Sequence, residues 1–136
     1  MRPLSVALAG LVLVAAAARA ADGACPLPGQ HRQASIELFF GLSMPHGNLP
    51  APRWTAFEDA VLARHLPRGF TVFDASGAWQ DASHRRTAHE KTKVVLAVLP
   101  PDEAASAVEG IVRGFKALLP NQQSVGVVST EVCAVF

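Results

Sequence analysis

The sequence predicts an α+β domain in which two helices cover one face of a four-stranded sheet. Residues 94–99 form an unbroken apolar run that is rich in valine and ends at two prolines. Such a run is typical of a strand that is buried on both faces. Three further stretches have the composition of strands, and two segments carry apolar residues at helical spacing. A strand buried on both faces needs a neighbour on each side, so we expect the other elements to be arranged around this run.

The first twenty residues are interpreted as a signal peptide. Arg2 supplies a positive charge, residues 4–18 form an apolar, alanine-rich core, and residues 18–20 (Ala-Arg-Ala) have the small-x-small form of a cleavage site. We expect cleavage after Ala20 and export of the mature chain, which would then be periplasmic or secreted.

Two alternatives to a cleaved signal peptide remain open. An uncleaved membrane anchor would need about 20 apolar residues, and this core is shorter. A lipoprotein acylated at Cys25 would need an aliphatic residue three positions earlier, where Asp22 stands. Both alternatives are disfavoured for these reasons.

Charge and composition exclude two classes of partner. Without Arg2 and Arg19, ten of the twelve basic side chains remain against eleven acidic ones, a formal charge of −1. The mature chain contains neither a basic block nor a second hydrophobic segment, so we expect no nucleic acid partner and no membrane span after cleavage. Its length of about 116 residues suits one domain with one core.

The mature chain begins with an extended lead-in at residues 21–34, which contains two prolines and a glycine and has no periodicity. The single α+β domain is expected to span residues 35–136. Its first strand covers residues 35–41, because apolar side chains occupy every second position from Ile36 to Phe40.

Both helices are predicted from apolar residues that recur three and four positions apart, with prolines flanking each segment. The first is expected at residues 53–66. The second is expected at residues 103–119, with Asp102 as its N-cap. Gly110 and Gly114 lie within it, and we expect them to allow a close approach of the helix backbone to the sheet.

A hairpin is predicted between the two helices in the sequence. Residues 69–81 are expected to form the second strand, with a turn or bulge at residues 74–77, and residues 87–99 form the third. Counting back from the polar turn between these strands places Trp79 roughly opposite Glu90.

A valine-rich strand at residues 124–136 completes the order strand, helix, strand, strand, helix, strand. Short, right-handed connections turn this order into a ferredoxin-like split β-α-β sandwich with the spatial strand order 4-1-3-2. The third strand is internal in that order, as its composition requires, and we expect it to be a parallel neighbour of the first. The fourth strand is antiparallel to the first and returns towards the start of the domain.

The chain contains two cysteines, Cys25 and Cys133, at opposite ends of the mature sequence. Export places them in an oxidising compartment, and the predicted topology brings the two chain ends together. We therefore expect a Cys25–Cys133 disulfide. The alternative is that Cys133 is a small buried thiol and Cys25 lies in a frayed tail.

Several segments of the chain carry a resemblance to a known group. They are residues 36–41, 54–57, 69–79 and 90–95, and the most specific pattern among them is Asp74-x-x-Gly77-x-Trp79 followed by Glu90-x-x-Lys93. With them the chain resembles the small exported bacterial proteins grouped as domain of unknown function 3574, over nearly all of the mature sequence and at both cysteines. Members of that family often have glutamine before the tryptophan, where this chain has Ala78. The resemblance implies the fold and an export route but no activity, because the family is uncharacterised.

The candidate ligand-binding residues are polar and aromatic side chains of the predicted sheet, namely Glu37, Phe39, Asp74, Trp79, Glu90 and Lys93. If the first and third strands are parallel neighbours, Glu37 and Lys93 meet on the face away from the helices. A carboxylate, a lysine and an indole on that face can hold a small polar ligand or tune a general acid. The alternative is a structural ion pair, with Trp79 as a lid over the core.

Two other motifs are not expected to carry chemistry. Ser43 follows a glycine in the manner of a nucleophile elbow, but Pro45 stands where the second glycine is needed. His84 and His89 are five positions apart, which places them on opposite faces of an extended strand, and further ligands are not evident in the sequence. We expect neither a metal nor a cofactor.

The sheet face opposite the helices is the strongest functional clue. The residues expected on this open face are Phe39, Val95, Ala97 and Leu99, with Ile36, Val94 and Leu96 turned to the helices. An exposed apolar patch of this kind marks a partner surface. Our first hypothesis is a non-catalytic binding or interaction module whose open face takes a small ligand, an envelope protein or a second copy in a homodimer, unless the N-terminal lead-in covers it. The alternative is a small enzyme that acts on a small organic molecule, with Glu37 or Glu90 as acid or base beside Lys93.

Overall fold

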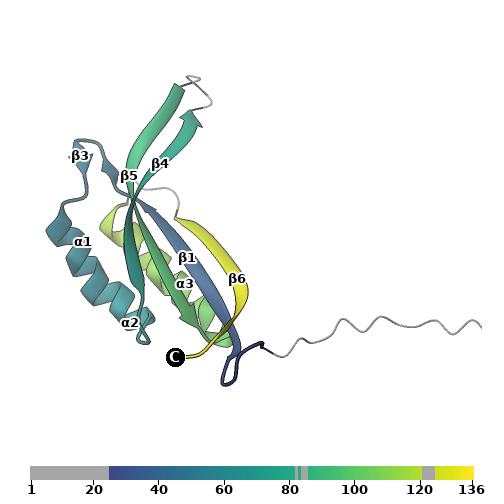
Figure 1. Ribbon diagram of the computed structural model, residues 1–136. Helices are drawn as coiled ribbons and strands as arrows, with labels where there is room; N and C mark the ends of the chain where they lie inside the picture. Colours follow the sequence, from purple (N-terminus) through teal and green to yellow (C-terminus); the bar gives the residue numbers. More distant parts are fainter. Residues whose placement is uncertain (1–24, 82, 84–85, 121–124) are drawn as a thin grey trace, which may run out of the picture.

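The computed structural model describes residues 25–81, 83, 86–120 and 125–136 (Figure 1). The expected signal peptide lies outside the described residues. The elements are β1 (His31–Gly41), β2 (Ser43–Met44), β3 (Gly47–Asn48), α1 (Ala51–Phe57), η1 (Glu58–Leu62), α2 (Ala63–His65), β4 (Thr71–Asp81), β5 (Arg86–Leu99), α3 (Pro101–Leu118) and β6 (Gly126–Ala134). Because η1 is a π-helical turn between α1 and α2, these three elements form one continuous helix. None of the helices in the described part of the chain is both long and apolar enough to cross a membrane.

The main sheet has the strand order β4-β5-β1-β6, which confirms the predicted ferredoxin-like sandwich with its most apolar strand inside. The three pairings are all antiparallel. The expected parallel pairing of β1 with β5 is therefore wrong. In a split β-α-β unit the helix crossover relates β1 to β4, and β5 is inserted between them in the opposite direction. Figure 1 shows both helices on one side of the sheet.

Several boundaries differ from those expected. β1 begins at His31, inside the expected lead-in, because residues 31–34 continue the pairing with β6. The ladder between β4 and β5 runs without a break from Thr71 to Asp81, so the expected turn or bulge at residues 74–77 is absent from this strand pair. α3 begins at Pro101 with Pro100 in the N-cap position, which leaves the expected cap, Asp102, in the first helical turn.

The core lies between the sheet and the helices. Ile36, Leu38 and Phe40 on β1 are at most 1% exposed. The register pairs Ile36 with Ala97 and Leu38 with Val95, and because paired residues share a face, these β5 side chains also point to the helices. The prediction that Val95, Ala97 and Leu99 face away from the helices is therefore wrong.

An aromatic cluster forms the centre of this core. Phe40 makes edge-to-face contacts with Trp54, Phe57 and Phe115, with ring centroids 5.5, 5.6 and 4.7 Å apart. Edge-to-face pairs in this distance range contribute about 0.5–1.5 kcal/mol beyond their buried area. The cluster joins one strand to both helices, so it fixes the position of the two helices on the sheet.

The two glycines of α3 allow close packing against the other helix rather than against the sheet. A Cβ at Gly110 would overlap the imidazole of His65, and a Cβ at Gly114 would lie 2.8 Å from Cγ1 of Val61. His65 belongs to α2 and Val61 to η1. The cost of glycine in a helix interior, about 1 kcal/mol each, is offset by this helix–helix contact.

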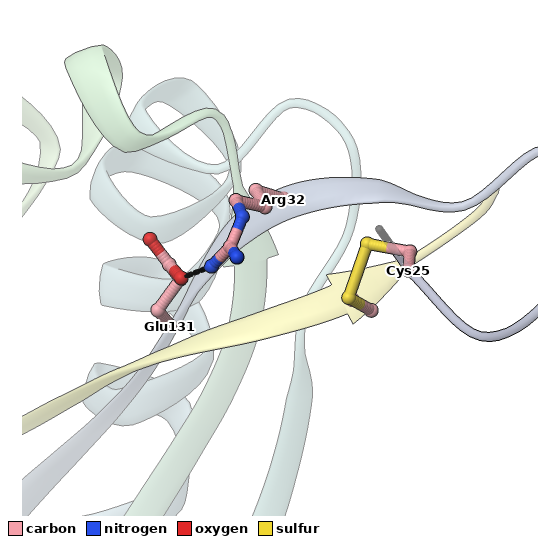
Figure 2. Close-up of polar contacts among 4 residues, drawn as sticks. Cys25, Arg32 and Glu131 are labelled. Carbon is pink, nitrogen blue, oxygen red and sulfur yellow. Dashed lines mark hydrogen bonds and ion pairs between the residues drawn. A yellow bond between two sulfur atoms is a disulfide. The ribbon is translucent and has the colours of Figure 1, made fainter. Parts of the chain in front are cut away.

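The structure contains the expected disulfide between Cys25 and Cys133, with the two Cα atoms 5.5 Å apart. Beside it, the Gln30 amide donates a hydrogen bond of 3.2 Å to the carbonyl of Cys133. Figure 2 shows Arg32 on β1 forming an ion pair with Glu131 on β6 close to the bridge. These contacts attach the N-terminal segment of the described chain to the last strand.

Candidate functional site: the open face of the sheet

The open face is the side of the sheet that the helices do not cover. Antiparallel pairing puts opposed residues on the same face, so the register identifies its members. They include Glu37 and Phe39 of β1, Phe73 of β4, Val94, Leu96 and Val98 of β5, and Gly126 and Val128 of β6, with the small polar residues Ser35, Thr71 and Thr130 towards one end of the face. The alternation of β1 was predicted correctly, whereas the assignment of β5 was shifted by one residue. A shift of one residue moves every side chain of a strand to the other face.

Large apolar side chains on the open face remain accessible. Phe39 is 36% exposed, Phe73 50% and Val128 48%. Phe39 and Phe73 flank Val94 from its two neighbouring strands. The Phe39 side chain also lies over Gly126, where a Cβ would come within 3.2 Å of the Phe39 Cβ and 3.4 Å of the ring. The open face is thus a continuous apolar surface that crosses the sheet.

One charged side chain lies within this apolar surface. Glu37 is exposed, and its neighbours in register are Leu96 on one side and Val128 on the other. A carboxylate between apolar side chains is accommodated at the monomer surface because water solvates it. If a partner covers the open face, this carboxylate must receive a cation or hydrogen-bond donors from the partner, because a buried unpaired charge is strongly destabilising.

The strands β4 and β5 extend beyond the rest of the sheet as a two-stranded arm. β1 ends at Gly41, opposite Thr92, whereas the pairing of β4 with β5 continues to Asp81 and Arg86. In Figure 1 this arm projects past the sheet at the top of the molecule. We define the arm as residues 75–81 and 86–92.

Trp79 lies on the arm and is 48% exposed. It pairs with Ala88, and Glu90 pairs with Gly77, so the prediction that Trp79 lies opposite Glu90 is off by two residues. An offset of two leaves both side chains on the same face of the ribbon. This face is the continuation of the open face, because Phe73, Gly77 and Trp79 alternate on one side of β4.

Asp74 and Lys93 lie on the other side of the sheet, towards the helices. They are direct partners in the register, and Lys93 Nζ is 2.6 Å from Asp74 Oδ1. The Lys93 side chain is 21% exposed and its ammonium lies 5.8 Å from the ring centroid of Trp54, whereas the Asp74 side chain is 85% exposed. Lys93 therefore covers the edge of the aromatic cluster, and the pair has the geometry of the structural alternative.

The structure separates Glu37 from Lys93. Lys93 pairs with Phe40 and Glu37 pairs with Leu96, so the two side chains project from opposite faces of the sheet. Glu90 shares the open-face side with Trp79 and is also on the opposite side from Lys93. The expected meeting of a carboxylate with this lysine on the open face is wrong, and with it the acid–base arrangement that the enzyme hypothesis required.

Two adjoining hollows lie at the end of the open face farthest from the arm. One has a volume of about 190 Å³ and the other about 480 Å³, and Arg68, Val98 and Phe136 line both. Phe136 is 97% exposed. The lining is mixed, with His31 and Gln33 contributing polar groups to the larger hollow.

The described residues contain no group of three histidine, cysteine, aspartate or glutamate side chains that could hold a metal ion. His84, one of the two histidines considered from the sequence, lies outside the described residues. Sequence reasoning missed Phe73, Leu96 and Val128 as members of the open face. The alternation of Val72 and Phe73 on β4 contained the signal, but only the register tells which of the two faces the helices.

Solved structures with this fold align with most of the chain. A phage SAM lyase in complex with S-methyl-5'-thioadenosine is 14% identical, with 79% of this chain and 91% of the lyase covered and a TM-score of 0.51. CutA from Synechococcus elongatus PCC7942 is 5% identical, with 76% and 80% covered and a TM-score of 0.52. CPII from Thiomonas intermedia K12, bound to ADP, AMP and acetate, is 14% identical, with 79% and 92% covered and a TM-score of 0.50. At these identities the similarity shows the fold alone.

A comparison of the sequence with curated proteins finds no match. The sequence does match a family model over a range that includes the open face, the arm and Cys133. The matching model is described as protein of unknown function (DUF3574) and covers residues 35–136, and the chain therefore belongs to this family.

Proposed function

We propose that this protein is an exported, non-catalytic interaction module that binds its partner through the open face. The observation that carries the proposal is the continuous apolar surface of Phe39, Phe73 and Val128, each at least 36% exposed. Contiguous apolar patches are uncommon on monomeric soluble proteins and mark interaction sites. The apolar groups would supply the binding free energy, and Glu37 at the centre would supply orientation.

The arrangement of the charged residues supports a binding role over a catalytic one. Lys93 is paired with Asp74 and packs near the Trp54 ring on the helix side, while Glu37 lies alone among apolar neighbours on the open face. A general acid or base acts on a substrate that is held within hydrogen-bond reach of it, and the register neighbours of Glu37, Leu96 and Val128, have no polar side-chain group to hold one. A single carboxylate in an apolar surface instead suits the recognition of a partner that carries one cation.

Export is part of the proposal and has its own support. The first twenty residues have the features of a signal peptide, and the disulfide between Cys25 and Cys133 would persist only in an oxidising compartment. We expect the mature protein in the periplasmic or secreted fraction, with its N-terminus at Ala21. Intact-mass measurement of the exported protein tests this, and a full-length mass in the cytoplasmic fraction would contradict it.

The test of the interaction surface is photo-crosslinking in living cells. A photoreactive phenylalanine analogue replaces Phe73 on the open face, and in a matched control it replaces Ala105, an exposed residue of α3. We expect a discrete covalent adduct from position 73 and none from position 105. If position 73 gives no adduct although the variant is exported and oxidised, the open face is not an interaction surface and the proposal is wrong.

A further inference from the structure

We propose that the partner of the open face is an amphipathic helix of another protein, with two cationic side chains about 20 Å apart, one for Glu37 and one for Glu90. This inference rests on the proposed function and names the chemistry of the partner. It is carried by the placement of the two carboxylates, and of an aromatic ring beside each, on one side of the sheet and the arm.

The two carboxylates project from the same side. The register puts Glu37 of β1 opposite Leu96 of β5, and Glu90 stands six residues before Leu96 on β5. Because six is an even number of residues, Glu90 and Leu96 share a face of their strand. At about 3.3 Å per residue, the two carboxylates are about 20 Å apart along the strands.

Neither carboxylate forms an ion pair with a residue that the structure describes. The ion pairs of the described residues are Arg32–Glu131, Arg68–Glu103 and Lys93–Asp74, and none of them involves the open face or the arm. Arg86 is a cation on this side of the arm, but it stands four residues from Glu90 and opposite Asp81. A partner that covers Glu37 and Glu90 must therefore bring the cations itself, because a buried unpaired charge is strongly destabilising.

An aromatic ring lies beside each carboxylate. Phe39 follows Glu37 by two residues on β1 and is 36% exposed. Trp79 is 48% exposed, and because it stands two residues after Gly77, the partner of Glu90, it is the diagonal neighbour of Glu90 across the arm. Diagonal neighbours are about 7–8 Å apart, within reach of aromatic and long side chains. A lysine or arginine that pairs with either carboxylate can thus also contact a ring face, which adds cation–π attraction.

Gly77 makes room for the side chain of Glu90. A Cβ at Gly77 would lie 2.9 Å from Oγ1 of Thr92 and 3.9 Å from Cγ of Glu90. The side chains of Thr92 and Glu90 therefore lie over the backbone of Gly77, towards the strand that carries Trp79. Glu90 is half-buried in this position. The glycine thus brings the carboxylate and the indole together on the arm.

The surface between the two carboxylates suits a helix. It begins with Phe39 and Val94 and continues with Gly41 and Thr92, which do not protrude, because Gly41 has no side chain and Thr92 is 8% exposed. An extended segment on the face of a sheet would leave its backbone groups unpaired, whereas a helix pairs its own. Residues fourteen apart lie on nearly the same side of a helix and about 21 Å apart, which matches the spacing of the carboxylates.

The arm is twisted relative to the sheet, as Figure 1 shows. A straight helix can still reach both carboxylates, because lysine and arginine lay their long apolar stems along a surface and carry the charge at the end. The stems would lie on the rings of Phe39 and Trp79. The apolar surface then contributes to binding at both ends of the helix as well as at its centre.

The first test uses a synthetic helical peptide of about 18 residues. It carries lysines fourteen positions apart, leucine and alanine between them on the same face, and glutamine elsewhere. Fluorescence anisotropy measures its binding to the exported protein with the disulfide intact. We expect saturable binding that weakens at least tenfold when both lysines are replaced by glutamine. The E37Q/E90Q protein should bind the original peptide at least tenfold more weakly.

The matched control is E109Q, which removes an exposed carboxylate from α3 and should leave the dissociation constant unchanged. Circular dichroism checks that each variant is folded. If E37Q/E90Q fails to fold, the comparison of the lysine and glutamine peptides on the unaltered protein still tests the inference. Absence of binding, or binding that neither the peptide change nor the protein change weakens, would overturn it.

Charge exchange tests the spacing. Glu37→Lys should be rescued by a peptide with glutamate in place of the lysine at one end, and Glu90→Lys by a peptide with glutamate at the other end. A peptide with its lysines seven positions apart, about 10 Å, should bind at least tenfold more weakly than the original. Rescue of both variants by the same peptide, or equal affinity for the two spacings, would refute the two-point contact.

Crosslinking in cells separates this inference from the proposed function. The photoreactive analogue at Phe73 is combined with E37Q/E90Q in one strain and with E109Q in another. We expect the adduct to be lost in the first strain and kept in the second, and the crosslinked partner segment to carry two basic residues at helical spacing. An adduct that survives E37Q/E90Q, or that joins two copies of this chain, would overturn the inference and leave the proposed function intact. No adduct in any strain would overturn both.

Discussion

The Cys25–Cys133 disulfide joins the two ends of the described chain, and its removal should reduce stability without changing the folded structure. The bridge spans a sequence separation of 108 residues. In the chain-entropy model, a loop of this length restricts the unfolded ensemble by about 4.7 kcal/mol at 25 °C. We expect the folded ends to remain in place in its absence, because the pairing of β1 with β6 continues to His31 and Ala134 and because Glu131 forms an ion pair with Arg32.

This loss is large relative to the stability of a small domain, which is typically about 5–15 kcal/mol. The double variant C25S/C133S should therefore unfold in urea at a midpoint about 2 M below that of the oxidised protein, for an m-value of roughly 2 kcal/mol/M. Equilibrium urea unfolding followed by circular dichroism measures the shift. Reduction of the wild-type protein should produce the same midpoint as the double variant.

The control removes a neighbouring contact and leaves the bridge. Glu131→Gln breaks the ion pair between Glu131 and Arg32. Because the two side chains are 60% and 46% exposed, the substitution should lower the free energy of unfolding by less than about 1 kcal/mol. Equal midpoints for C25S/C133S and the oxidised protein would refute the reasoning, because the loop constraint would then contribute nothing. A large loss in Glu131→Gln would show that the strand ends depend on the ion pair rather than on the bridge.

Three further predictions follow from burial and contact. Phe73→Ala should lower the free energy of unfolding of the monomer by less than about 1.5 kcal/mol in urea titrations, because half of the side chain is already exposed; a loss above about 3 kcal/mol would place it in the core. Gly114→Ala should lower the free energy of unfolding by about 1–2 kcal/mol, because its Cβ would lie 2.8 Å from Val61. In a double-mutant cycle, Val61→Ala should reduce the cost of Gly114→Ala. Additive free-energy changes would contradict the contact. Asp74→Asn should cost less than about 1 kcal/mol because Asp74 is 85% exposed opposite Lys93, and a larger loss in thermal unfolding would show that the pair is a structural requirement.

The fold was predictable because its signals are local. The apolar run at residues 94–99 identified the internal strand, and the spacing of apolar residues identified both helices to within a few residues. Alternation from Ile36 to Phe40 separated the buried face of β1 from the face that carries Glu37 and Phe39. Once six elements and short connections are known, few topologies remain, and the observed strand order is among them.

The candidate site was only partly predictable. Phe39 and Glu37 lie on the open face and Trp79 lies on the arm that extends it, as their residue types suggested. Asp74 and Lys93 form a pair on the helix side instead. Their pairing depends on the direction of β5 relative to β1 and on the register, and neither is encoded in the composition of a strand whose two faces are both apolar.

The sequence by itself determined the class of fold, the internal position of the most apolar strand and the pair of cysteines available to join the chain ends. These follow from hydrophobic periodicity and composition, which act over a few residues at a time. Only the tertiary structure decided which alternate residues of β5 face the helices, that β4 and β5 project as an arm, and that Phe39 and Phe73 flank Val94 from the two neighbouring strands. The reason is that side chains alternate with a period of two, so a strand that is apolar throughout fits either face equally well until hydrogen bonding to its neighbours selects one register.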